Sequence, residues 1–146
     1  MPLKLPFHTS ISDGLYPSRV ITVSGTVLQN AKSFYIDLCT ESDIAFRFTP
    51  RLDENTVVWN TEIQGVWGTE ERDLPFGMPF RREHSFTQAT ETVPLGIRVE
   101  IICEADHYSV SVDGQHLLDY VHRLKDLPAI DRLTVDGDLE LNSVNV

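Results

Sequence analysis

Short apolar runs separated by turn-forming residues limit the folds open to this sequence more than any other feature. The runs are rich in Val, Ile, Phe, Tyr and Thr, and none keeps the spacing of an amphipathic helix. Gly, Asn and Asp lie between them, and Asp113-Gly114 between two alternating runs is the strongest hairpin signal. The pattern predicts strands over residues 19–26, 33–39, 44–48, 56–62, 98–104, 108–112, 115–119, 132–137 and 139–144.

This strand pattern predicts an all-β fold. In the run 34–38, residues two apart are apolar and share one face of their strand, which supplies the interior of a sandwich. Only residues 125–130 suit a short 3₁₀ turn. We therefore predict a single domain over residues 1–146, a jelly-roll sandwich of two antiparallel sheets.

The charge balance bears on partners. The chain has 12 Lys and Arg against 22 Asp and Glu, a net charge of −10, which repels a phosphate backbone over most of the surface. No apolar run at the N-terminus suits a secretory signal, and no stretch approaches the length of a membrane span. The sequence thus predicts a cytosolic, soluble protein that neither binds nucleic acid nor inserts into a membrane.

The reactive residues give no sign of catalysis. The two cysteines, Cys39 and Cys103, lie in apolar runs and are expected to be reduced core thiols. The five histidines lack metal-ligand spacing, and no nucleophile elbow or phosphate-binding Gly loop is present. Glu70 and Glu71 are adjacent, so they would face opposite ways on a strand and cannot act as a glycosidase pair. We expect no enzyme activity, no metal and no cofactor.

Two segments carry the chemistry of a sugar site: Arg47-Phe48-Thr49-Pro50-Arg51 and Trp67-Gly68-Thr69-Glu70-Glu71-Arg72. A hexose presents C–H bonds on one face and hydroxyls around its edge. An exposed indole covers the first, and Arg, Asn and Glu side chains bind the second. Without further context, a core Trp beside ordinary surface ion pairs would explain the same residues.

These segments, with others along the chain, resemble a galectin carbohydrate-recognition domain, most closely the C-terminal domain of tandem-repeat galectins of the ecalectin type. The resemblance extends over stretches 14–18, 24–28, 43–46, 53–55, 58–61, 112–116 and 122–124. It implies a galactoside bound on the concave sheet through His-x-Asn-Pro-Arg, Val-x-Asn and Trp-Gly-x-Glu-x-Arg. Family members are made in the cytosol, exported without a signal sequence and commonly dimerise, so a cytoplasmic or extracellular homodimer is expected.

The resemblance assigns the site residue by residue, with two departures. Five side chains match the family's pattern: Arg51, Asn60, Trp67, Glu70 and Arg72. Asn60 is expected to donate and accept at one hydroxyl, and Glu70 to link Arg51 and Arg72 in one network.

The departures are Arg47, which stands where the family has His, and Thr49, which stands where it has Asn. The family reads the axial 4-hydroxyl of galactose through these positions, so we expect weak or absent lactose binding.

Two alternatives for Arg47 remain open. Arg47, Arg51 and Arg72 could together favour an anionic glycan such as one bearing sulfate or sialate. Arg47 could instead pair with Asp53 or Glu54 and block the pocket.

Two functions remain open as well: a lectin of shifted specificity that binds glycans or glycoproteins, and a galectin-fold protein that has lost sugar binding and acts through protein contacts. Residues 87–96 are a Thr-rich insertion relative to the family and are expected to form an exposed loop.

Overall fold

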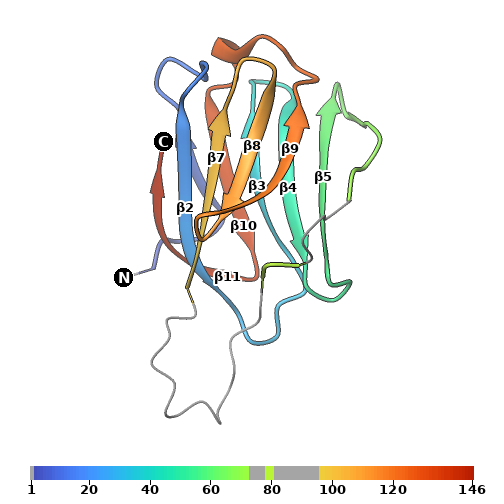
Figure 1. Cartoon of the computed structure of the whole chain (residues 1–146). Helices are drawn as coiled ribbons and strands as arrows, with labels where there is room; N and C mark the ends of the chain where they lie inside the picture. Colours follow the sequence, from blue (N-terminus) through green and yellow to red (C-terminus); the bar gives the residue numbers. More distant parts are fainter. Residues whose placement is uncertain (1, 73–77, 81–95) are drawn as a thin grey trace.

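The chain folds into two antiparallel β-sheets packed face to face, in a computed structural model that describes residues 2–72, 78–80 and 96–146. Figure 1 shows β7, β8 and β9 as one layer in front of β10, β3 and β4. The predicted all-β sandwich is confirmed.

The six-stranded sheet has the order β1 (Phe7–Ser10), β10 (Arg132–Gly137), β3 (Phe34–Cys39), β4 (Ile44–Arg51), β5 (Thr56–Ile63), β6 (Val66–Trp67). The five-stranded sheet has the order β11 (Leu139–Asn145), β2 (Val20–Val27), β7 (Gly96–Cys103), β8 (His107–Val112), β9 (Gln115–Val121). A single 3₁₀ turn, Leu127–Ala129, lies within the predicted range 125–130. No helix in the described part of the chain is long and apolar enough to cross a membrane.

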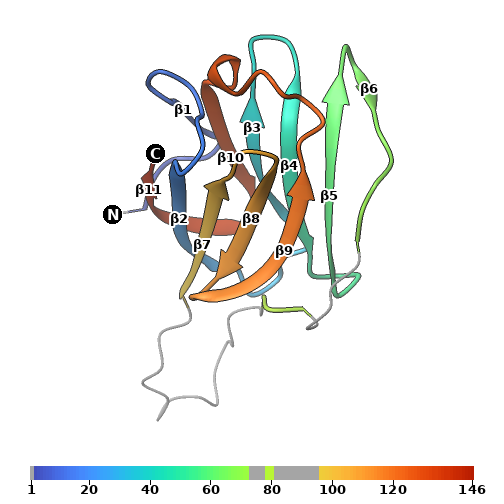
Figure 2. The same cartoon turned by 45° about the horizontal axis from the view of Figure 1, so that its top comes forward.

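All nine predicted strands are present, with ends that differ by up to three residues, and two short edge strands were missed. The prediction ended β4 at residue 48 because Thr49-Pro50 breaks the apolar run, but the strand continues to Arg51, opposite Thr56. The missed strands, β1 and β6, have four and two residues and lie at the sheet edges, where the hydrophobic pattern is weak. Figure 2 shows β6 beyond β5 at the outer edge.

The interior is formed by alternate residues of both sheets. Phe46 of β4 stacks on Tyr108 and Tyr120 of the facing sheet, with ring centroids 4.9 and 5.0 Å apart. All three rings are fully buried. Burial of a large aromatic side chain contributes about 1.5–3 kcal/mol to folding stability, so this stack stabilises the packing of the two sheets at their centre.

A bulge in β4 sets which side chains of that strand face outward. The pairing with both neighbouring strands shifts around Ala45, which is an extra residue buried beside Phe46. The carbonyl of Ala45 accepts a hydrogen bond from the Thr61 hydroxyl at 2.7 Å. From Arg47 onward, β4 alternates regularly, with odd-numbered residues half-buried and even-numbered residues in the core.

Two tight turns connect neighbouring strands as hairpins, one in each sheet. Asp113 and Gly114 have φ of 52° and 84°, which confirms the predicted β8–β9 hairpin. Gln64 and Gly65 have φ of 51° and 78°, and this turn folds β6 back so that Trp67 lies opposite Glu62 of β5.

Both cysteines are free, as expected, and Cys103 is fully buried whereas Cys39 is half-buried. Residues 87–95 of the predicted insertion lie outside the described residues, and Gly96 begins β7.

Candidate functional site

The outer face of the six-stranded sheet gathers the predicted site residues through strand register. Arg47, Thr49 and Arg51 alternate along β4 on the side opposite the core. Arg47 lies opposite Asn60 of β5 and also opposite Asp37 of β3. Cross-strand partners share one face of a sheet, so these side chains form a single polar row.

A hollow of about 610 Å³ lies on this face. Six of the seven predicted site residues line it: Arg47, Thr49, Arg51, Asn60, Trp67 and Glu70. Arg72 is not among the lining residues, and it reaches the hollow only through its bond to Glu70. The indole of Trp67 remains 41% exposed, so the alternative of a core Trp at this position is wrong.

The predicted network around Glu70 is present. One carboxylate oxygen of Glu70 accepts from Arg51 Nη2 at 3.3 Å, and the other accepts from Arg72 Nη2 at 2.7 Å. Glu54 joins the network through contacts of 3.5 Å to Arg51 and 3.7 Å to Arg72. The hydrogen bond from Arg72 is the main cause that lowers the pKa of Glu70 below its ordinary value, which keeps the carboxylate charged.

Arg47 pairs with Asp37, a residue that the sequence analysis did not single out. Its Nε and Nη2 donate to the two Asp37 oxygens at 2.8 and 2.7 Å. The prediction that Arg47 pairs with Asp53 or Glu54 is therefore wrong, because those residues follow the strand whereas Asp37 lies directly opposite. A lone Asp in the middle of the apolar run Phe34–Cys39 was the signal that could have revealed it.

The Asp37–Arg47 pair is largely buried. Asp37 is 3% exposed, and burial raises the pKa of its carboxyl, although the hydrogen bond from Arg47 opposes this shift. The guanidinium of Arg47 also lies 4.2 Å from the ring centroid of Tyr35 and 5.0 Å from that of Trp67. Arg47 thus covers part of the indole that a sugar ring would need.

The arginines of the site carry no excess positive charge. Arg47, Arg51 and Arg72 contribute +3, and their partners Asp37, Glu54 and Glu70 contribute −3, which sums to zero. The alternative that these arginines favour an anionic glycan rested on a local excess of positive charge. The paired carboxylates remove that excess.

Asn60 is almost fully engaged by the protein. Its Oδ1 accepts from the Thr61 amide at 2.8 Å and from Arg123 Nη1 at 3.1 Å, and its Nδ2 donates to the Gly68 carbonyl at 2.9 Å. An amide oxygen has two lone pairs, and both are used. The expectation that Asn60 both donates to and accepts from a ligand is wrong, because only one N–H remains.

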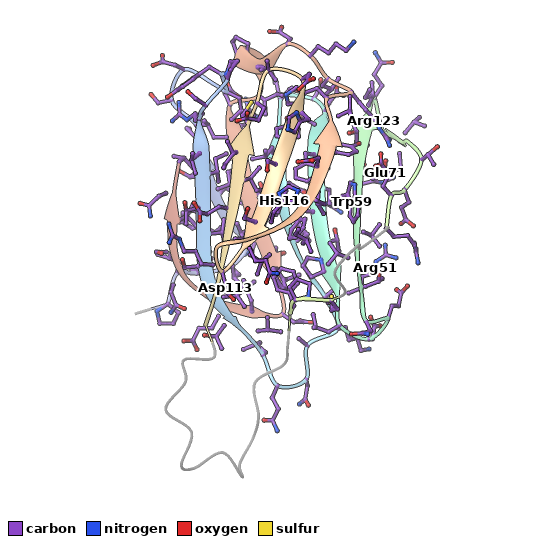
Figure 3. The ribbon with its side chains drawn as sticks, viewed as in Figure 1. Arg51, Trp59, Glu71, Asp113, His116 and Arg123 are labelled. Carbon is purple, nitrogen blue, oxygen red and sulfur yellow. The ribbon has the colours of Figure 1, made fainter. Side chains whose placement is uncertain are left out.

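Glu70 and Glu71 diverge, as predicted. Glu71 accepts from the indole N–H of Trp59 at 3.3 Å and from Arg123 Nη2 at 2.8 Å. Trp59, a residue of β5, is buried, and Figure 3 shows Glu71 and Arg123 above it along that strand. Sequence reasoning missed Arg123, because it lies 63 residues from Asn60 and belongs to no sugar-binding signature.

The site offers an aromatic face for stacking and polar groups for hydrogen bonding. Among residues 2–72, 78–80 and 96–146, no group of three or more His, Cys, Asp and Glu side chains is arranged to hold a metal ion. An open indole beside charged donors and acceptors suits a polar ring with one apolar face.

Comparisons with known proteins agree with this geometry. The family model described as galactoside-binding lectin matches residues 6–146. The chain is 37% identical to mouse galectin-3 over 99% of its length, and 38% identical to rat galectin-8 over 97%. These alignments cover 51% and 42% of the two relatives, so the chain spans about half the length of the curated relatives it matches. Similarity to ecalectin-type domains stays a prediction.

Solved structures share the fold. The galectin LEC-6 of Caenorhabditis elegans superposes with a TM-score of 0.83 at 22% identity, covering 99% of this chain and 91% of its own. Sheep galectin-11, solved in complex with glycerol, gives 0.76 at 25% identity and covers 98% of each chain. With a family match over nearly the whole chain and curated relatives above 30% identity, the chain belongs to the galactoside-binding lectins, the galectin family.

Proposed function

We propose that the hollow on β3, β4, β5 and β6 binds a galactoside-type glycan, with weaker affinity for lactose than the family pattern provides. The observation that carries this proposal is the exposed Trp67 in one hollow with Arg51 and Glu70, where Arg72 holds Glu70 from outside the hollow. The indole takes the C–H face of a pyranose, and the network binds vicinal hydroxyls. Stacking of this kind contributes about 0.5–1.5 kcal/mol beyond area burial.

The weakened lactose affinity follows from Arg47 and Thr49. A neutral imidazole can accept a hydrogen bond from a hydroxyl, whereas the Arg47 guanidinium only donates, and two of its nitrogens already bind Asp37. Thr49 lacks the amide donor of Asn and is shorter. At about 1 kcal/mol for each hydrogen bond lost, with more for an unmatched polar group, these two changes reduce lactose affinity about 30-fold or more.

Isothermal titration with lactose, followed by a glycan array, tests the proposal. Trp67→Leu is expected to remove binding to every glycan that the array identifies. Val66→Ala is the matched control, because Val66 is the exposed neighbour of Trp67 and its side chain points to the other face of β6. Full retention of glycan binding in Trp67→Leu would contradict this site.

A second candidate function is a galectin-fold protein that no longer binds sugar and acts through protein contacts. The observation that favours it is the Arg47 guanidinium over the Trp67 ring, held there by Asp37. The double change Arg47→His with Thr49→Asn separates the two candidates. Restored lactose binding supports an intact sugar site behind Arg47, whereas failure of this rescue together with an empty glycan array favours the second function.

Location and assembly are proposed on the family resemblance alone. We propose a cytosolic protein that is also exported without a signal peptide, and a homodimer as its assembly. Light scattering coupled to size-exclusion chromatography measures the dimer, and detection of the protein in culture medium from cells with intact membranes measures export.

A further inference from the structure

Arg123 connects the five-stranded sheet to the sugar-binding face of the other sheet. It lies two residues after the end of β9 at Val121, and its side chain reaches across to the segment after β6. Figure 3 places Arg123 and Glu71 near one another beside β5, with Arg51 further down the same edge. Arg123 itself is not among the residues that line the hollow.

Three hydrogen bonds and a ring hold the Arg123 guanidinium. Nη1 donates to Asn60 Oδ1 at 3.1 Å, and Nη2 donates to the Thr69 carbonyl at 2.9 Å and to Glu71 at 2.8 Å. The guanidinium carbon lies 5.1 Å from the ring centroid of Tyr120. With only 29% of its side chain exposed, Arg123 is held in a partly desolvated place where charged hydrogen bonds are strong.

The bond to Asn60 fixes the polarity of the Asn60 amide. Arg123 and the Thr61 amide can only donate, so the Asn60 atom between them must be its oxygen. The Gly68 carbonyl can only accept, so the atom facing it must be nitrogen. The amide cannot turn over without losing all three bonds. Asn60 is 7% exposed and presents one N–H to a ligand, as a donor only.

The bond from Arg123 to the Thr69 carbonyl holds the segment that runs from Trp67 to Glu70. Thr69 lies between Trp67 and Glu70, two residues that line the hollow. Gly68 lets the guanidinium pass this segment, because a Cβ there would lie 2.5 Å from Arg123 Nη1 and 3.2 Å from Asn60 Oδ1. The absence of a side chain at position 68 is therefore matched to the presence of Arg123.

We propose that Arg123 is a positioning residue of the glycan site, which sets Asn60 as a hydrogen-bond donor and holds the segment that carries Trp67 and Glu70. It does not touch the glycan. The glycan atom nearest Asn60 is then an acceptor oxygen. The effect on affinity rests on the function proposed above, whereas the effect on the Asn60 amide exists in the free protein.

The test compares Arg123→Met and Arg123→Lys with Arg132→Met as the matched control. Arg132 is an exposed arginine of β10 whose ion pair with Asp131 is 3.6 Å long. The first measurement is ¹⁵N NMR of the Asn60 side-chain amide without ligand. In Arg123→Met the amide protons are expected to shift and to exchange with solvent at least several-fold faster, while Arg132→Met leaves both unchanged.

The second measurement is lactose affinity by titration, on a background of Arg47→His with Thr49→Asn. Loss of one charged hydrogen bond to the site corresponds to about a 10-fold or greater loss of affinity in Arg123→Met. The lactose affinity of Arg123→Lys is expected to lie between those of the unchanged background and Arg123→Met, because an ammonium cannot reach all three acceptors at once. Gly68→Ala provides a second perturbation of the same contacts: the added methyl displaces the guanidinium and also lies 3.2 Å from Asn60 Oδ1, so an amide change is expected there too.

The outcomes distinguish the two proposals. An unchanged Asn60 amide in folded Arg123→Met, or unchanged lactose affinity despite a changed amide, overturns the positioning role. A lower melting temperature with unchanged amide signals and unchanged lactose affinity would show that Arg123 only stabilises the fold, which also overturns the positioning role. If Arg123→Met does not fold, Arg123→Lys and Gly68→Ala decide by the same readouts. No lactose binding on the rescued background, together with an empty glycan array, refutes the proposed function, while the amide signals still report whether Arg123 sets Asn60.

Discussion

Removal of Arg47 is expected to destabilise the domain more than neutralisation of its partner Asp37. The Asp37 side chain is 4% exposed and the Arg47 side chain 31%, so Arg47→Met leaves a buried carboxylate without its cation. Such a loss costs about 3–5 kcal/mol when the pair is fully buried. Because Arg47 is partly exposed, we expect about 2–4 kcal/mol, which lowers the melting temperature by roughly 4–16 °C.

Asp37→Asn is expected to lower the free energy of unfolding by less, about 1–2 kcal/mol. The amide keeps an acceptor for Arg47, and the freed guanidinium can reach solvent. The asymmetry between the two variants is the signature of a buried carboxylate beside a half-exposed cation. Arg98→Met serves as the control, because Arg98 is 59% exposed and pairs with Glu100 at 3.7 Å, and it should change stability by less than about 0.5 kcal/mol.

The cost of Arg47→Met also depends on pH. Burial already raises the pKa of Asp37 in the intact protein, and loss of Arg47 removes the hydrogen bond that opposes this shift. A carboxyl whose pKa is raised on folding stabilises the folded state below its unfolded pKa and loses that contribution as pH rises through the folded value. The variant should therefore approach the wild type in stability as pH falls.

Urea unfolding followed by far-UV circular dichroism at pH 7 and near pH 4 measures these differences. A cost of Arg47→Met that equals that of Asp37→Asn, or that does not shrink at low pH, would refute the role assigned to the pair. Either result would mean that Arg47 contributes mainly through its contacts with the Tyr35 and Trp67 rings.

Three further predictions concern other parts of the molecule. The pKa of Glu70 lies below its ordinary value of 4.5, so the carboxylate stays charged above that pH and is protonated only as pH falls through the lower folded value. Glycan affinity should therefore be constant from pH 7 to about 4.5 and fall at lower pH. Glu70→Gln should weaken binding at neutral pH, and its deficit relative to the wild type should shrink once Glu70 is protonated. Gly137→Ala should lower the free energy of unfolding by about 3 kcal/mol or more, because φ is 114° and a Cβ would lie 2.4 Å from the Phe34 backbone. Gly114→Ala should lower it by only about 1 kcal/mol, because φ is 84° and the space around a Cβ is free. Equal losses in thermal unfolding would contradict the packing argument. Burial raises the pKa of Cys39 to about 12 and that of Cys103 to about 11, so iodoacetamide at pH 8 should modify both thiols at least roughly 100-fold more slowly than an ordinary thiol. Rapid labelling of the native protein would contradict this.

Much of the fold was readable from the sequence because each strand carries its own pattern. Alternation of apolar and polar residues along β2, β8 and β10 marks a core face without reference to any neighbour. Asp113-Gly114 specifies its hairpin locally, through backbone angles that few residues adopt. The edge strand β6 was not predictable, since two residues carry no period and its pairing depends on β5.

The sequence by itself determined the sandwich, the family and six of the side chains that line the hollow. Only the tertiary structure decided their partners. Arg47 meets Asp37, and not the nearby Asp53 or Glu54, because sheet register after the Ala45 bulge puts the two opposite one another. Asn60 meets Arg123 because the two sheets pack together. Residue type and spacing fix what a strand can bury, whereas hydrogen-bond partners distant in sequence are fixed only when strands pair and sheets stack.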